Sequence, residues 1–271
     1  MNHKCDQAGP LSKRKLAVIL TKGTVALIVI IVGERFASAG DSRDQLCHLS
    51  EASWVLITPA GRSLTAALDQ LDVEHRWLRS DLRIAWRSGE PITGPLEKRR
   101  APRTAAETHC SAFAAAVASH FGVYLLRPPE HSHVLLADAQ FDWLSSPSGR
   151  QAGWKSVKGP LDAQKRANSG MLVVAVVKNS DARLPGHIAV VRPSDKRVIC
   201  ITRCGPQILQ AGFTNYRSAD LILGFERHSG AWLPAGKGSV RFFSHTVDLC
   251  LGRCSASECS RSRNFNCERP D

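Results

Sequence analysis

The chain has 271 residues, of which 43% are hydrophobic, so most of it can bury a core. Lys and Arg number 36 against 24 for Asp and Glu, which gives a net charge of +12 with neutral histidines and favours an anionic partner. The basic residues are scattered, and only Lys98-Arg99-Arg100 forms a tight run, whereas nucleic-acid-binding proteins cluster basic residues with aromatics on one face. We therefore expect an anionic cell-wall polymer such as peptidoglycan as partner, and no nucleic acid.

Residues 1–39 have the pattern of an export signal. Basic residues precede an apolar run at 23–33, and Ala37-Ser38-Ala39 supplies the small side chains of a cleavage site, after which Gly40 is the first mature residue. The stretch 16–32 is also long enough for a short membrane helix. We expect a signal peptide or an uncleaved signal anchor. The protein is then exported to the periplasm or the extracellular space, and it contacts the membrane only through this segment.

The cysteine content suits an exported protein that bears disulfides. The nine cysteines are Cys5, Cys47, Cys110, Cys200, Cys204, Cys250, Cys254, Cys259 and Cys267. Without Cys5 in the leader and a reactive Cys110, seven remain, so they cannot all pair within one chain. The last four form no CxxC pair and have only His245 nearby, which argues against a zinc site. We expect no metal and no cofactor, and a poorly ordered Cys-rich tail at 249–271.

The stretch 108–120 predicts a buried helix that begins beside a cysteine. A threonine at its start can cap the helix and places Cys110 in the first turn, where the backbone N–H groups and the helix dipole favour a thiolate. Phe113, Val117 and Phe121 recur every four residues and form an apolar face, and the alanines between them allow a sheet to approach closely. A cysteine in such a helix is more often a small inert apolar side chain, so the helix alone does not identify a nucleophile.

The remaining pattern predicts helices followed by closely spaced strands. Helices are expected at 63–71, 134–144 and 161–168. Strands are expected at 53–58, 171–177, 187–191, 197–202, 207–210, 221–225 and 240–245. This order indicates an α+β fold with an antiparallel sheet. We place it in a domain of residues 108–248, preceded by an N-terminal extension at 40–107.

Three polar residues downstream are candidates for work with Cys110. His187 opens a predicted strand directly after Gly186; a histidine in such a place is ordinarily solvated, but a cysteine at a helix start upstream makes it a candidate base. Gln210 ends the β-forming run that follows, and Asn215 lies shortly beyond it. Either amide can fix the tautomer of an imidazole, so both remain candidates for the third position.

This order of motifs resembles the NlpC/CHAP group of papain-like cysteine peptidases and amidases. The resemblance covers about residues 108–246 and rests on Cys110-Ser111-Ala112-Phe113, on Gly186-His187-Ile188-Ala189-Val190-Val191, and on a polar residue in the next strand. It implies a papain-like fold in which the nucleophile helix packs on the antiparallel sheet. It also implies a catalytic triad of Cys110, His187 and either Gln210 or Asn215.

The resemblance implies an exported cysteine amidase or endopeptidase that cleaves an amide bond in peptidoglycan peptides. We expect Cys110 and His187 to rest as a thiolate–imidazolium pair, in which the imidazolium later protonates the leaving amine. The alternative from another class is a non-catalytic, disulfide-bearing envelope protein that uses the same fold for binding or scaffolding. A third option is another acyl transfer, such as transglutamination.

Overall fold

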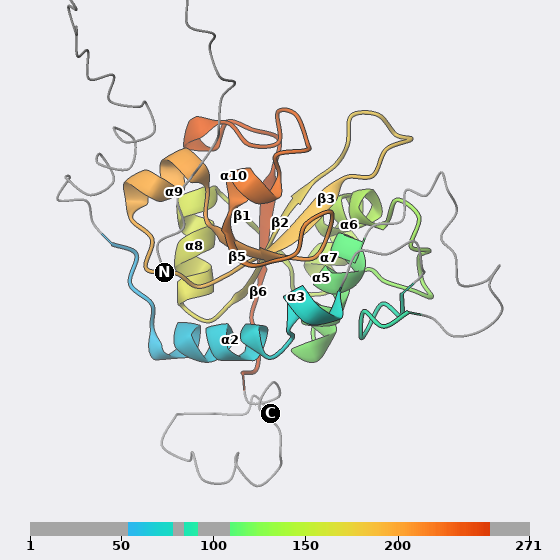
Figure 1. Ribbon diagram of the computed structural model, residues 1–271, viewed down its shortest axis with the longest axis horizontal. Coiled ribbons are helices and arrows are strands. Elements are labelled where there is room, and N and C mark those ends of the chain that lie inside the picture. Colours follow the sequence, from blue (N-terminus) through green and yellow to red (C-terminus); the bar gives the residue numbers. More distant parts are fainter. Residues whose placement is uncertain (1–53, 78–83, 92–108, 250–271) are drawn as a thin grey trace, which may run out of the picture. The chain divides into compact units, whose positions relative to one another are not determined.

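The computed structural model of the chain is shown in Figure 1 and describes residues 54–77, 84–91 and 109–249. These residues belong to one compact unit, residues 52–271. The predicted export signal, the cap at Thr108 and the four tail cysteines lie outside the described residues. Within the described ranges, no helix combines the length and the apolar character needed to cross a membrane.

A six-stranded antiparallel sheet is the centre of the described chain, with strand order β1-β6-β2-β3-β4-β5. The strands are β1 (Lys155–Val157), β2 (Leu172–Val177), β3 (His187–Val191), β4 (Gln207–Gln210), β5 (Tyr216–Asp220) and β6 (Arg241–His245). The α+β class and the antiparallel sheet are therefore confirmed. The expected strands at 171–177, 187–191, 207–210 and 240–245 correspond to β2, β3, β4 and β6.

Helices surround this sheet. They are α2 (Pro59–Asp69), α3 (Val73–Arg76), α5 (His109–His120), α6 (Leu136–Ser145), α7 (Pro147–Gln151), α8 (Pro160–Asn168), α9 (Val198–Cys204) and α10 (Leu221–Gly224), with a 3₁₀ turn η1 (Pro234–Gly236). The three helices expected at 63–71, 134–144 and 161–168 are confirmed as α2, α6 and α8, within a few residues at each end. These segments have an apolar stripe of helical period and bury it against the sheet or its neighbours.

Two expected strands are wrong, because 197–202 and 221–225 form helices α9 and α10. In α9 Ile201 is buried while its neighbours are partly exposed, and the Thr202 hydroxyl donates to the Val198 carbonyl one turn back. In α10 Leu221 and Phe225, four residues apart, are buried, whereas Ile222 and Leu223 between them are exposed. The burial period is thus helical in both. The strand expected at 53–58 is reduced to one isolated bridge between Trp54 and Arg197.

Strand β2 is buried on both faces and divides the apolar interior in two. On one face Leu172, Val174 and Val176 pack in the same core as α5, and on the other Val173, Ala175 and Val177 pack with α8. Figure 1 shows α5 and α6 on one side of the strands and α8 on the other. The α5-side core also contains residues of α2 and α3, namely Leu64, Ala67, Leu68 and Val73, together with Trp77 and Ile84. The described part of the expected extension therefore shares the core of the sheet domain.

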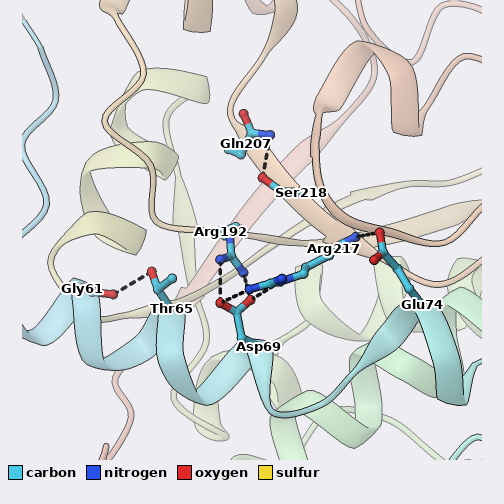
Figure 2. Close-up of polar contacts among 8 residues, drawn as sticks. All are labelled: Gly61, Thr65, Asp69, Glu74, Arg192, Gln207, Arg217 and Ser218. Atoms are coloured by element: carbon cyan, nitrogen blue, oxygen red, sulfur yellow. Dashed lines mark hydrogen bonds and ion pairs between the residues drawn. The ribbon is translucent and has the colours of Figure 1, made fainter. Parts of the chain in front are cut away.

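A charged cluster fastens α2 to the sheet, as Figure 2 shows. The Asp69 carboxylate accepts hydrogen bonds from Arg192, just after β3, and from Arg217 on β5 (Nη2 to Oδ2, 2.9 and 3.0 Å). Burial alone raises the pKa of Asp69, but the hydrogen bonds from Arg192 and Arg217 outweigh it and lower that pKa to about 2. Glu74 of α3 accepts from the Arg217 backbone N–H at 3.1 Å. Helices α2 and α3 are thereby connected to β5, the edge strand next to β4.

Candidate active site

Cys110 is the second residue of α5 and is 1% exposed, as expected for the first turn of a buried helix. The helix packs on β3 and β4. Its alanines allow this close approach, and Phe113 packs edge-on against Trp77 with ring centroids 5.2 Å apart. Gly122 ends the helix with a positive φ of 69°, which favours glycine because it has no Cβ. Helix α5 therefore places Cys110 near the first residue of β3.

His187 is the first residue of β3, and its position is fixed from α6. The carboxylate of Asp138 accepts the backbone N–H groups of Asn179 (2.8 Å) and Gly186 (2.9 Å), which pins both ends of the turn between β2 and β3. Any Cβ at position 186 would lie 2.2 Å from the Val177 carbonyl oxygen, so only glycine fits before the histidine. The role of Asp138 could not be predicted from local pattern, because its partners are about 40 to 50 residues away in the chain.

The imidazole of His187 is hydrogen-bonded to the side chain of Gln210 at the end of β4, with Nε2 and Oε1 2.8 Å apart. The Gln210 amide nitrogen donates to the Thr214 carbonyl at 3.1 Å, which identifies Oε1 as the acceptor for the ring. In the neutral ring the proton therefore sits on Nε2, and Nδ1 carries the lone pair. Both side chains are buried, His187 at 6% exposed and Gln210 at 3%.

Asn215, the rival for the third position, binds the backbone instead. Its Oδ1 accepts from Gly212 N–H at 3.0 Å, and its Nδ2 donates to the carbonyls of Val73 (3.0 Å) and Trp77 (2.8 Å). The Asn215 amide thus joins the loop after β4 to α3. The structure brings Gln210, and not Asn215, to the imidazole.

The electrostatics of His187 differ from the resting ion pair expected above. Burial lowers the pKa of His187 to about 4, although the hydrogen bond that the ring donates to Gln210 opposes this. A neutral imidazole is therefore favoured near pH 7. The site suits a neutral base that takes the thiol proton as the sulfur attacks, rather than a preformed imidazolium.

Cys110, His187 and Gln210 line one pocket of about 270 Å³, so three of the four candidates are brought together. The other lining residues are His109, Pro185, Gly186, Gly212, Phe213, Thr214, Tyr216, Leu223, Gly224, Glu226, Arg227 and His228. The charged side chains of Glu226 and Arg227 were not foreseen, because they follow a segment that was predicted as a strand. Within the described ranges, no group of three or more His, Cys, Asp or Glu side chains is placed to hold a metal ion.

A thiol, an imidazole whose tautomer is fixed by an amide, and a helix start facing the same pocket can support acyl transfer through sulfur. The amide of Gln210 orients the ring and cannot take its proton. No model of a known protein family matches the chain, and no curated protein matches it. The chemical arrangement of these side chains is therefore the basis for a functional assignment.

Proposed function

We propose that the protein is a papain-like cysteine hydrolase, an amidase or endopeptidase of the NlpC/CHAP type. The observation that carries this proposal is the shared pocket of Cys110, His187 and Gln210, with the His187 ring held by Gln210. A structural cysteine needs neither a buried histidine in the same pocket nor an amide that fixes the tautomer of that histidine. The order of the three residues along the chain matches the resemblance noted in the sequence.

In the proposed reaction the Cys110 sulfur attacks an amide carbonyl while Nδ1 of His187 accepts the thiol proton. The oxyanion of the tetrahedral intermediate accepts hydrogen bonds from backbone N–H groups in the first turn of α5, which point toward the N-terminal end of the helix. His187 then donates the proton to the leaving amine, and a thioester remains on Cys110. A water molecule, deprotonated by His187, attacks the thioester and releases the acid and the thiol.

Peptidoglycan peptides are the proposed substrates. The net charge of +12 favours residence in an anionic wall. The pattern of residues 1–39 favours export to the compartment where that polymer lies. The pocket of about 270 Å³ has room for amino-acid side chains of such a peptide.

Mass analysis of purified muropeptides incubated with the chain from Gly40 onward tests this proposal. We expect fragments whose masses sum to that of the substrate plus one water for each amide bond cut, and no fragments with Cys110→Ala. Cys200→Ala, on α9 and away from the pocket lining, is the matched control and should retain activity. Intact muropeptides after incubation with the folded protein would count against hydrolysis and favour a binding or scaffolding role.

A further inference from the structure

His187 is surrounded by aromatic rings as well as by its amide partner. The ring of Phe225 meets it edge-on, with centroids 4.7 Å apart and an interplanar angle of 75°. The ring of His228 is stacked on it, with centroids 5.3 Å apart and an angle of 16°. The hydrogen bond to Gln210 Oε1 fixes one nitrogen of the ring, but a single bond still allows rotation about that contact. The stacked ring of His228 restrains the plane of the imidazole.

His228 is held in place by the turn that follows α10. Its backbone N–H donates to the Phe225 carbonyl and its own carbonyl accepts from Ala231 N–H, both at 2.9 Å. Phe225 and His228 therefore lie in one turn and both contact His187. Phe225 is 1% exposed and belongs to the α8-side core, whereas His228 is half-buried and lines the pocket. One ring anchors the turn, and the other faces the site.

The stacked pair also limits how many protons the site can hold. Burial lowers the pKa of His228 to about 4; a charge on His187 lowers it too, and Asp138 of α6 opposes both effects. The pKa of His187 is likewise about 4, so both rings are neutral near pH 7. The other titratable groups lining the pocket are His109 and Cys110 from α5, Tyr216 from β5, and Glu226 and Arg227 beside His228 in the chain. Two imidazolium ions stacked in this way repel each other, so the first proton hinders the second.

We propose that His228 is a positioning residue for the base His187. It stacks on the ring, keeps the plane that the Gln210 bond requires, and competes with His187 for a proton when the pH falls. This role rests on the proposed hydrolase function. It is tested through the tautomer and the pKa of His187, which are measured without a substrate.

The test compares His228→Ala, which removes the stacked ring, with His228→Phe, which retains an aromatic ring but cannot be protonated. Nitrogen-15 NMR of the imidazoles reports the tautomer and the titration of His187, whose signals are assigned by their loss in His187→Gln. His75→Ala is the matched control, because the His75 side chain is 80% exposed and lies outside the pocket lining.

We expect the Nε2–H tautomer of His187 to dominate in the wild type, in His228→Phe and in the control, and to be mixed with the other tautomer in His228→Ala. The rate of Cys110 alkylation by iodoacetamide at pH 7 should fall about tenfold in His228→Ala and by less than about twofold in His228→Phe. In His228→Phe the pKa of His187 should rise, because the competing proton site is gone.

The same tautomer and pKa in wild type and both variants, with each variant folded by its melting curve, would overturn the positioning role. If His228→Ala fails to fold, the pKa shift in His228→Phe decides alone: a rise supports the proposal, and no change overturns it. An effect on the tautomer together with intact muropeptides would leave this role standing and count against the hydrolase function instead.

Discussion

Two buried amide side chains of this protein bind different kinds of partner, with opposite consequences. Asn168, at the end of α8, donates to the carbonyls of Val55 and Ser194 at 2.7 Å and accepts from Ser194 N–H and the Gln164 amide at 2.9 Å. Gln210, at the end of β4, binds one backbone carbonyl and one imidazole. The first joins three segments of backbone, and the second orients a ring.

The difference lies in what the partner can still do. Backbone carbonyls and amides do not titrate near neutral pH, so the contacts of Asn168 contribute only to the fold. The imidazole bound to Gln210 retains a lone pair on its other nitrogen and lines a pocket with a thiol. A buried amide is thus a candidate for function when its partner retains an unused reactive atom. Substitutions in the two networks should therefore separate stability from activity.

The largest effect is expected for Cys110→Ala. Because no other thiol lines the pocket among the described residues, amide cleavage should fall on the order of 10⁴-fold or more. The side chain is small and buried, so the free energy of unfolding should fall by only about 1 kcal/mol. Product analysis and thermal unfolding measure the two effects. A disulfide at Cys110 in the mature protein would contradict the nucleophile assignment.

Asn168→Ala is expected to have the opposite profile. The substitution leaves the Ser194 N–H and two carbonyls without their side-chain partner in a buried region, which should cost about 3 kcal/mol of unfolding free energy. Turnover at a temperature where the variant is folded should change by less than about twofold. Urea unfolding and steady-state kinetics check this. A large loss of turnover in the folded variant would break the distinction between the two networks.

Asp69→Asn should lower the free energy of unfolding by about 2 kcal/mol, because Arg192 and Arg217 lose their shared counter-charge and α2 is held less firmly to the sheet. The folded pKa of Asp69 is about 2, below the ordinary 3.8. Its contribution is therefore complete above about pH 3.8 and is lost as the pH falls through about 2. Unfolding measured from pH 7 to pH 2 should show wild type and variant converging in acid. The exposed pair of Asp142 and Lys178 provides the control, and Asp142→Asn should change stability little.

The sequence predicted the central elements because their patterns are unambiguous. The Ala-rich helix beginning at Cys110, the continuous apolar strand at 171–177 and the strand opened by Gly186-His187 each have one period or length that fits a single structure. These same elements position the pocket, so three of its residues followed from the sequence. Short apolar segments do not fit a single structure, because four or five apolar residues suit a strand or a helical turn equally well. For this reason 221–225 was predicted as a strand although it forms a helix.

Contacts between distant segments could not be predicted in this way. Strand β5 was missed because it is a polar strand at the edge of the sheet, where β4 is its one partner among the strands that the structure describes. The choice of Gln210 over Asn215 depends on the backbone groups of Val73 and Trp77, which saturate the Asn215 amide from about 140 residues away. Local pattern carries no information about such a distant acceptor.

An intermediate loss of activity is expected for Gln210→Ala, and its pH dependence is the sharpest test of the role of this amide. The hydrogen bond that the His187 ring donates to Gln210 orients the ring, but Gln210 takes no proton, so turnover at pH 7 should fall about tenfold, far less than in Cys110→Ala. That bond also raises the pKa of His187 against the effect of burial, so its loss should lower the pKa further below about 4. A lower pKa keeps the base neutral into stronger acid, so the acidic limb of kcat/KM should move to lower pH in the variant. Asn215→Ala should leave that limb in place and lower the melting temperature instead, because its amide binds backbone only. A shift of the acidic limb in Asn215→Ala, with none in Gln210→Ala, would assign the third position to Asn215.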